Sequence, residues 1–139
     1  MIILGLLEQL KERVLTADGA IGTLLYSYGL DYCHEEMNVS KPEVVRNIHA
    51  QYIEAGADII QTNTYGANAI KLARYGLEER VQELNEAAVK LAKEAATGHD
   101  VFVVGTIGGI RGIRGTDLTL TEIIDAIVQP VSYTHLRAH

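Results

Sequence analysis

The sequence predicts an α/β fold built from parallel β–α units, and two observations carry this prediction. Short apolar segments of strand length, at about 14–17, 57–61 and 101–105, alternate with segments of helical periodicity. Two of these segments are followed directly by small and hydrogen-bonding residues, Asp18–Thr23 and Gln61–Asn68. Apolar strands that alternate with helices are typical of βαβ units, whose crossovers are right-handed. The predicted order is therefore a helix followed by three strand–helix units.

The first unit is predicted as helix, strand and loop. Apolar residues recur at helical spacing over residues 3–13, and the strand at 14–17 stops at Asp18-Gly19. Residues 24–39 are polar and aromatic without a clear period. This composition predicts a long loop, with a helical turn near 22–28.

The second unit has a clear helix start. Ser40 and Glu43 have the spacing of a capping box, and Pro42 lies in the first turn. Gly56 is placed to end this helix before the strand at 57–61. The helix has one apolar face, formed by Val44, Ile48 and Tyr52 with Val45 and Ile53 beside them.

The third unit contains the longest predicted helix. A helical turn near 68–75 breaks at Gly76, and a helix follows over 77–97 until Gly98. Val101–Val104 is continuously apolar, which predicts a strand buried on both faces. The buried stripe of the helix is predicted to consist of Val81, Leu84, Ala88, Leu91 and Ala95.

The last segment begins with a glycine-rich loop at 105–116. Thr119 and Glu122 form a second capping box, and Pro130 is predicted to end the helix that follows. Val131–His139 has no periodicity and is basic. Two interpretations of these residues stay open, a non-native tail and an ordinary frayed terminus.

The length, net charge and composition of the chain argue against several classes of protein. The 139 residues suffice for one domain, which we place at 1–129 with 130–139 as a doubtful tail. A net charge of −6 argues against a nucleic-acid partner. No apolar run has the length of a membrane span, and Met1–Leu7 lacks the basic start of a signal peptide. The single cysteine, Cys33, excludes an internal disulfide and fits a cytoplasmic location.

Both strand ends carry candidate ligand-binding groups. Asp18 can accept hydrogen bonds from an ammonium group, and the backbone N–H of Gly19 can approach a carboxylate. The alternative is a simple Asp-Gly turn. Thr62, Asn63 and Thr64 supply hydroxyl and amide groups past the second strand. Their alternative role is to cap the next helix.

The remaining polar residues are weaker candidates. Gly105–Gly112 has the composition of a phosphate-binding loop but not the spacing of a nucleotide motif, so close approach to a ligand or to a neighbouring loop is favoured. Cys33 beside His34 is poor evidence for a metal site. His49 is predicted on a helix surface, and Tyr65 either lines a pocket or packs. A solvent-exposed charged face is predicted from Lys71, Arg74, Glu78, Glu79 and Arg80.

Three loops together resemble those of the homocysteine S-methyltransferase family. The matching segments are Asp18–Thr23, Gln61–Asn68 and Gly105–Gly109, and their spacing also agrees. The helix start at Leu118–Glu122 is similar as well, so the resemblance covers roughly residues 5–129. It implies a parallel (β/α)₈ TIM barrel, of which this chain supplies about the first three units.

The resemblance also implies an activity and a set of roles. The enzyme transfers a methyl group to the sulfur of homocysteine and forms methionine, with a zinc ion held by three cysteines that stabilises the thiolate. The donor is a methylfolate, S-methylmethionine or betaine. Asp18 is implied to bind the substrate ammonium, Gly19 and Thr62 its carboxylate, and Asn63 and Thr64 to support them.

The chain also departs from the family pattern. The three zinc cysteines have no counterparts here, because Cys33 lies in the first loop, and the acidic residue of a middle strand is missing. Gly109 stands where the family often has proline. We therefore expect the fragment alone to bind no zinc and to transfer no methyl group. Two other functions stay open, a non-catalytic binding or assembly fragment and a different barrel enzyme with a phosphate-bearing ligand at the Gly105–Gly112 loop.

Overall fold

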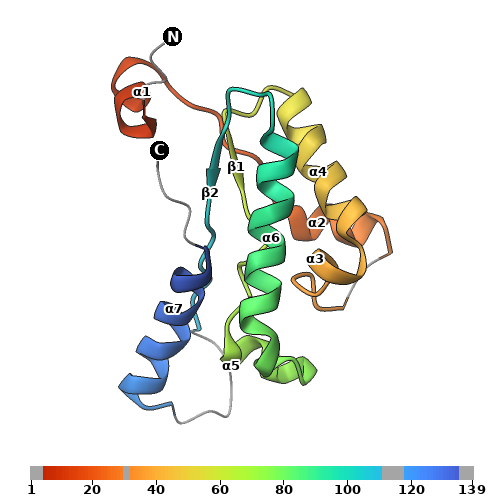
Figure 1. The fold of residues 1–139 in the computed structure, drawn as a ribbon, viewed down its shortest axis with the longest axis vertical. Helices are drawn as coiled ribbons and strands as arrows, with labels where there is room; N and C mark the ends of the chain where they lie inside the picture. Colours follow the sequence, from red (N-terminus) through yellow and green to blue (C-terminus); the bar gives the residue numbers. More distant parts are fainter. Residues whose placement is uncertain (1–4, 30–31, 111–117, 135–139) are drawn as a thin grey trace.

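The computed structural model describes residues 5–29, 32–110 and 118–134 (Figure 1). Short helices lead into the long helices α4 and α6, α7 is a third long helix, and the two strands lie between helical segments. In chain order the elements are α1 (Leu6–Glu12), α2 (Ile21–Ser27), α3 (Met37–Ser40), α4 (Pro42–Glu54), β1 (Ile59–Gln61), α5 (Ala69–Leu72), the 3₁₀ turns η1 (Ala73–Tyr75) and η2 (Glu78–Arg80), α6 (Val81–Ala96), β2 (Phe102–Val104) and α7 (Leu120–Thr134).

The sheet is parallel and small. β1 pairs with β2 in the register Ile59 to Phe102, and Ala17 forms a parallel bridge with Ile59 from the other side. The predicted strands at 57–61 and 101–105 are confirmed in shorter form. The predicted strand at 14–17 is reduced to this one bridge, supported by the carbonyl of Thr16, which accepts hydrogen bonds from the N–H groups of Asp58 and Ile59. The strand order places β1 in the centre.

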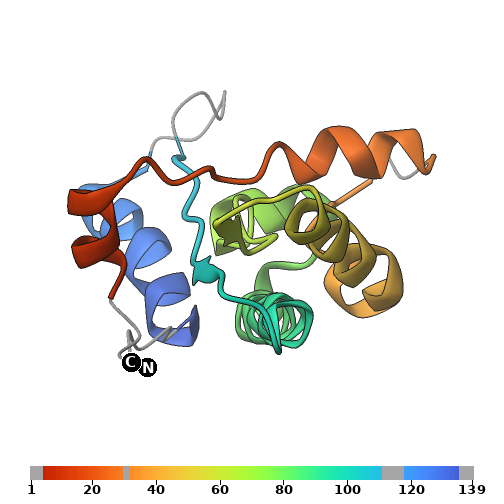
Figure 2. The same ribbon diagram turned by 90° about the horizontal axis from the view of Figure 1, so that it is seen from above.

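The main core lies between α4, α6 and the sheet. Figures 1 and 2 show α4 and α6 on one side of β2, with α1 and α7 toward the other side. Val45, Ile48 and Leu91 meet between the two long helices, and Ile60 of β1 packs with Ala92 of α6. The predicted stripe of α6 is confirmed for its first four positions, while Ala95 is only half-buried.

The prediction from the sequence placed one residue on the wrong face of α4. His49 is fully buried in α4, although we predicted it on the surface. It follows Ile48 and precedes Ile53, and these two apolar neighbours turn the same side of α4 toward the core. Neither ring nitrogen has a hydrogen-bond partner, and burial lowers the pKa of His49 to about 4. The imidazole is therefore held in its neutral form.

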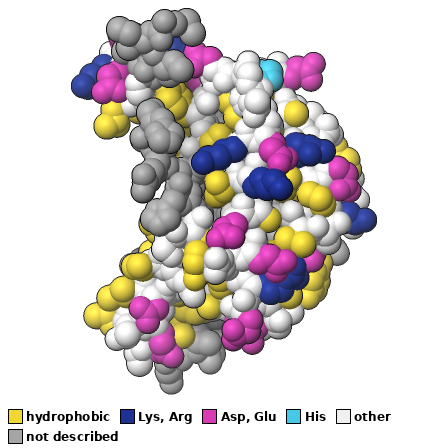
Figure 3. All heavy atoms as spheres, viewed as in Figure 1, with side chains coloured by type: hydrophobic (Ala, Val, Ile, Leu, Met, Phe, Trp, Pro, Cys, Tyr) yellow, Lys and Arg dark blue, Asp and Glu magenta, His cyan; other side chains and the backbone are white. Residues whose placement is uncertain are grey.

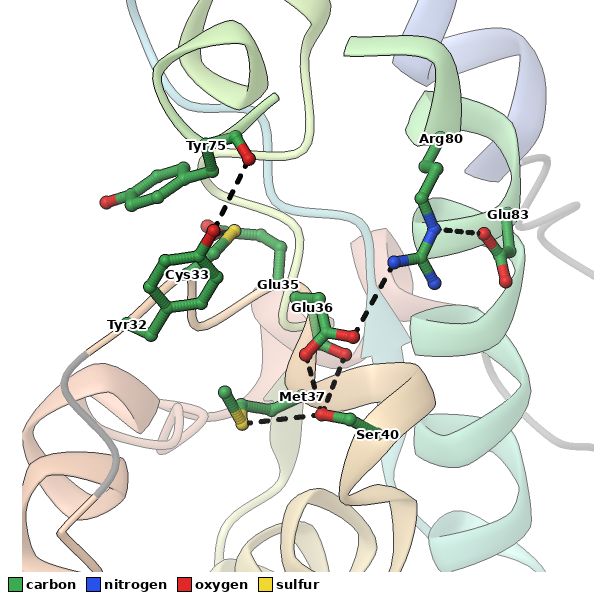
Figure 4. Close-up of polar contacts among 9 residues, drawn as sticks. All are labelled: Tyr32, Cys33, Glu35, Glu36, Met37, Ser40, Tyr75, Arg80 and Glu83. Carbon is green, nitrogen blue, oxygen red and sulfur yellow. Dashed lines mark hydrogen bonds and ion pairs between the residues drawn. The ribbon is translucent and has the colours of Figure 1, made fainter. Parts of the chain in front are cut away.

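The capping box predicted at Ser40 is wrong. Ser40 ends α3, and α4 begins at Pro42 with Lys41 at the N-cap and no side-chain cap. The Ser40 hydroxyl donates instead to the carboxylate of Glu36 at 2.6 Å (Figure 4). The carbonyl of Lys41 accepts from the N–H groups of Val44 and Val45 at 3.0 and 3.3 Å, so α4 starts one residue later than the capping box predicts. Pro42 at the first position has no N–H that would need a cap.

The other helix boundaries follow the sequence more closely. Gly56, Gly76 and Gly98 all have positive φ angles and end helical segments as predicted. The second capping box is confirmed, because the N–H of Thr119 donates to the Glu122 carboxylate at 2.8 Å and the N–H of Glu122 donates back to the Thr119 hydroxyl at 3.3 Å. The helical turn predicted near 22–28 is α2.

Two predictions about the last unit are wrong. Pro130 does not end the helix, because α7 continues to Thr134. Pro130 is itself buried, and Tyr133 one turn later packs against the cluster of Cys33, Leu72, Val81 and Leu84, so both sides of the proline are held by packing. β2 is only partly buried rather than enclosed on both faces. Whether residues 130–139 belong to the domain stays a prediction, and residues 135–139 lie outside the described part.

α7 and α1 leave apolar side chains at the surface. Figure 3 shows hydrophobic side chains gathered over α7. The exposed apolar residues of α7 are Leu120, Ile124, Ile127, Val128 and Val131, each between 39 and 73% exposed.

Among the described residues, no helix is both long and apolar enough to cross a membrane.

Candidate functional site

Asp18 and Gln61 join the first two strand ends. The N–H of Asp18 donates to the carbonyl of Ile59 at 2.9 Å, and this bond is part of the parallel bridge between Ala17 and Ile59. The Asp18 carboxylate accepts from the backbone N–H of Gln61 at 2.9 Å and from its side-chain amide at 3.1 Å. Asp18 is only 9% exposed, and this burial raises its pKa. Asp18 and Thr62 thus lie at the same end of the sheet, as predicted.

Thr62 and Thr64 join the second strand end to the third. Their hydroxyls lie 2.7 Å apart, and the Thr64 hydroxyl donates to the carbonyl of Thr106 at 2.7 Å. The N–H of Thr106 donates to the Thr62 hydroxyl at 3.1 Å. Both threonines are buried. These bonds fix the loop after β2 against the end of β1.

Asn63 connects the site to the loop before α4. Its amide donates to the carbonyl of His34 at 2.7 Å and to the side-chain oxygen of Asn38 at 3.0 Å. The Asn38 amide donates in turn to the carbonyl of Asn63 at 2.9 Å. The capping alternative for Thr62, Asn63 and Thr64 is wrong, because Asn68 caps α5 by accepting from the N–H of Lys71.

Gly19 and Gly108 are required by close packing rather than by a left-handed backbone. A Cβ atom on Gly19 would lie 2.7 Å from the Tyr52 hydroxyl, and one on Gly108 would overlap the carbonyl of Tyr65. Gly108 thus brings the third loop directly onto the second. Close approach to a neighbouring loop, one of the roles predicted for this glycine-rich segment, is confirmed there. Arg111 and Gly112 of the same segment lie outside the described residues.

These elements surround a pocket of about 290 Å³, which we call the strand-end pocket. Gly19, Thr62 and Asn63 line it, as do Gln61 and Thr106. Asp18 and Thr64 lie behind this lining, in contact with Gln61 and Thr62 respectively. The remaining lining residues are Ala20, Ile21, Gly22, His34, Glu35 and Tyr65.

Sequence reasoning missed His34 and Glu35 as pocket residues. They belong to a segment that we predicted as loop, where no period indicates which side chains face inward. The Glu35 carboxylate accepts from the N–H of Gly66 at 2.5 Å, which binds this loop to the second motif. One signal in the sequence could have indicated that they face inward, namely their position next to Cys33, whose side chain is buried.

The charged residues after β1 were predicted to form one solvent-exposed face, but only some of them are exposed. Lys71 is half-buried, with its ammonium 3.9 Å from the centre of the Tyr65 ring. Arg80 is half-buried and pairs with Glu83 and, at 3.6 Å, with Glu36 (Figure 4). Arg74, Glu78 and Glu79 are exposed, as predicted. The face is therefore split between solvent and the loops around the pocket.

Cys33 and the other described residues do not form a zinc site. Burial raises the pKa of the Cys33 thiol to about 11, which disfavours the thiolate that a metal needs. Its Sγ donates a weak hydrogen bond to Glu35 at 3.5 Å. Within the described ranges, no three His, Cys, Asp or Glu residues are grouped so as to hold a metal ion.

Comparison with known proteins identifies the family. A sequence model described as Homocysteine S-methyltransferase matches residues 15–131. The chain belongs to the homocysteine S-methyltransferase family. It is 35% identical to methionine synthase of Mycobacterium leprae (strain TN) and 37% identical to that of Mycobacterium tuberculosis (strain ATCC 25618 / H37Rv), each across 74% of this chain.

Solved structures show the same relationship. The metallated form of homocysteine methyltransferase MmuM from Escherichia coli matches 94% of this chain with a TM-score of 0.72 and 26% identity. Its oxidized form matches 90% with a TM-score of 0.71 and 26% identity. The chain spans 53% and 50% of these structures, and 10% of each methionine synthase.

Proposed function

We propose that this chain forms the homocysteine-binding strand ends of an enzyme that methylates the sulfur of homocysteine to give methionine. The observation that carries the proposal is the strand-end pocket, where three loops meet and present polar groups suited to the two charged ends of an amino acid. Family membership supports the reaction. The pocket supports the role of this part of the enzyme.

Each strand-end residue has a role in this proposal. Asp18 receives the substrate ammonium, which takes the place of the Gln61 side-chain amide on the carboxylate. A cation there favours the charged form of Asp18 and opposes the effect of burial on its pKa. The N–H of Gly19 and the hydroxyl of Thr62 hold the carboxylate end, and the Thr62 hydroxyl turns its proton from Thr64 to the substrate to do so. Asn63 and Thr64 keep the two loops in position.

The rest of the enzyme is also part of the proposal. We infer a parallel (β/α)₈ barrel in which this chain forms about the first three units, and further units cover β2 and the apolar face of α7. Zinc activates the thiol in this family, and its ligands would come from outside the described residues. The chain alone then transfers no methyl group. We expect the whole enzyme in the cytoplasm.

Calorimetric titration with three thiols tests the binding role. L-homocysteine carries both charged ends, 3-mercaptopropylamine lacks the carboxylate and 4-mercaptobutanoate lacks the ammonium. We expect each truncated thiol to bind about tenfold or more weakly, because it leaves a buried polar partner unmatched. Equal binding of all three would refute the assignment.

A pair of variants locates the ammonium. Asp18→Asn keeps the size of the side chain and removes its charge, so L-homocysteine should bind about tenfold more weakly while 4-mercaptobutanoate is unaffected. Asp125→Asn, on the exposed surface of α7, is the control and should change neither. Loss of affinity for both thiols in Asp18→Asn would indicate structural damage rather than ammonium binding.

A further inference from the structure

One side-chain nitrogen in the lining of the strand-end pocket is buried and has no hydrogen-bond partner. Among the described residues of that lining, only Nε2 of His34 is in this state. His49 and Asn85 also have unpartnered buried atoms, but they lie in α4 and α6 and do not line this pocket. A buried nitrogen without a hydrogen bond costs free energy. In the wall of a pocket, a bound ligand can supply the missing partner.

The imidazole of His34 is held in place by its neighbours. The ring of Tyr26 meets it edge to face, with the two centroids 4.8 Å apart. A Cβ atom on Gly22 of α2 would lie 3.0 Å from Nδ1 and 3.2 Å from Cε1, so the lack of a side chain there makes room for the ring. The carbonyl of His34 accepts from the Asn63 amide at 2.7 Å. The backbone and the ring are therefore both fixed, while Nε2 is left without a partner.

These contacts place His34 at the carboxylate end of the pocket. Its backbone is bonded to Asn63, which directly follows Thr62. Its ring lies against Gly22, which belongs to the same segment of the first loop as Gly19. Thr62 and Gly19 are the residues to which the proposed function assigns the substrate carboxylate. The carboxylate that is assigned to the ammonium lies behind the lining instead.

The carboxylate end has room for a further donor. A carboxylate has two oxygens with about four acceptor positions, and the Gly19 N–H and the Thr62 hydroxyl fill about half of them. A neutral imidazole carries one N–H, which on Nε2 would donate to another of these positions. A hydrogen bond to an ionised acceptor is roughly twice as strong as one between neutral groups. One bond would thus satisfy His34 and hold the substrate.

Two other polar side chains of the lining are unsuited to this role. The Thr106 hydroxyl already donates to the side-chain oxygen of Gln61 at 3.3 Å. The Glu35 carboxylate accepts from a backbone N–H, and an ionised carboxylate has no proton to donate. A second negative charge in the wall also makes a neighbouring donor more valuable to a substrate carboxylate, because like charges repel.

Taking the proposed function as its basis, we propose that His34 is a further substrate-binding residue, whose Nε2–H donates to the carboxylate of homocysteine. His34 then selects thiols that carry a carboxylate over thiols that lack one. It contributes to specificity at the end of the substrate remote from the sulfur, and the transfer of the methyl group does not pass through it.

Two substitutions separate the hydrogen bond from the packing of the ring. His34→Phe keeps a ring against Tyr26 and removes both nitrogens, and His34→Gln loses the ring but carries an N–H donor at about the reach of Nε2. In calorimetric titration of the 139-residue chain, L-homocysteine should bind about tenfold more weakly to His34→Phe. His34→Gln should retain affinity within about threefold. His99→Phe, at an exposed position, is the control and should bind as the unchanged chain does.

The truncated thiols show which end of the substrate His34 contacts. His34→Phe should lose about tenfold in affinity for 4-mercaptobutanoate, which has the carboxylate, and nothing for 3-mercaptopropylamine, which lacks it. Loss for 3-mercaptopropylamine alone would place His34 at the ammonium and overturn the proposal. Equal losses for both thiols would show that His34 only supports the fold of the pocket, which would also overturn it.

Imidazole ¹⁵N resonances of the unchanged chain give a readout that needs no substitution in the protein being titrated. The His34 signals are identified by their absence from His34→Phe, or from His34→Gln if the first variant does not fold. L-homocysteine and 4-mercaptobutanoate should shift the Nε2 resonance of His34 saturably, and 3-mercaptopropylamine should not. A resonance that none of the three thiols moves would contradict the proposal.

The same titrations keep this proposal distinguishable from the proposed function. If L-homocysteine binds the unchanged chain and His34→Phe equally well, the role of His34 is refuted and the strand-end pocket keeps its function. If L-homocysteine does not bind the unchanged chain at all, both proposals are refuted.

Discussion

The α4–α6 side of the sheet and the α7 side are both built from amphipathic helices, but the described residues enclose only the first. Val45, Ile48 and Ile60 are completely buried between α4, α6 and the sheet. On α7, apolar residues such as Ile124 and Val128 are about half exposed. An apolar stripe in a sequence therefore indicates that a helix has a partner. It does not indicate that the partner lies in the same stretch of chain.

Truncation of one apolar side chain on each side should give the largest contrast. Ile48→Ala removes a fully buried side chain between α4 and α6 and should lower the free energy of unfolding by about 2–5 kcal/mol, from lost transfer energy and a cavity. Ile124→Ala on α7 should change it by less than about 0.5 kcal/mol. Urea denaturation measures both, and equal losses would show that α7 is covered by something other than solvent.

On the α4–α6 side, His49 should make the free energy of unfolding depend on pH. Its pKa is about 4 in the folded chain and near the ordinary 6.5 in the unfolded chain, so the unfolded state binds the extra proton between these values. Stability should be unaffected above pH 6.5 and fall by up to about 3 kcal/mol as the pH drops to 4.

Comparison with a variant isolates this effect from other groups. Asp18, whose pKa is raised, acts in the opposite direction and is present in both proteins. His49→Gln should remove the loss between pH 6.5 and 4, and His99→Gln, at an exposed position, should keep it. Unfolding curves that have the same pH slope in all three proteins would show that His49 is accessible to protons when folded.

The contact between the second and third loops should be sensitive to a single methyl group. Gly108→Ala would place a Cβ atom on the Tyr65 carbonyl and should cost about 1–3 kcal/mol of stability. Gly109→Ala meets no atom within 4 Å and should cost less than about 1 kcal/mol. If thermal unfolding shows no difference between the two, the third loop does not pack on Tyr65 in solution.

The smallest effect should be on the open side, at the start of α7. Thr119→Ala removes one half of the capping box with Glu122 and should cost about 1 kcal/mol. Thr97→Ala, after the end of α6, is a suitable comparison because its hydroxyl serves only the carbonyl of Lys93. A larger loss for Thr97→Ala in urea denaturation would argue that α7 frays whether or not it is capped.

Local patterns in the sequence predicted the order of elements and the glycines that end the helices. They failed where distant parts of the chain decide the outcome. Ser40 has the spacing of a cap, but it is the last residue of α3 and its hydroxyl donates to Glu36. His49 is polar, yet its place beside Ile48 puts it in the core. Pro130 lies inside α7, because the packing of Tyr133 outweighs one missing hydrogen bond.

At the candidate site too, local patterns were predictive and contacts between distant segments were not predicted. Asp18, Gly19, Thr62, Asn63 and Thr64 were predicted because each follows a strand, and parallel strands bring their ends together. His34 and Glu35 were missed, because a loop without a period gives no indication of which residues face a pocket. A second pocket, of about 270 Å³, was missed for the same reason, since its lining residues come from segments 26–35 and 65–75, which only the fold brings together.

The central claim, that the strand-end pocket binds the amino-acid end of homocysteine, is tested most directly by amide chemical shifts. A ¹⁵N-labelled chain is titrated with L-homocysteine, and each backbone N–H reports its own surroundings. The account predicts that the largest saturable shifts occur at Gly19, Ala20, Thr62 and Asn63, around the strand-end pocket. Shifts confined to the outer surface of α6, or no saturable shift at these four residues, would contradict it.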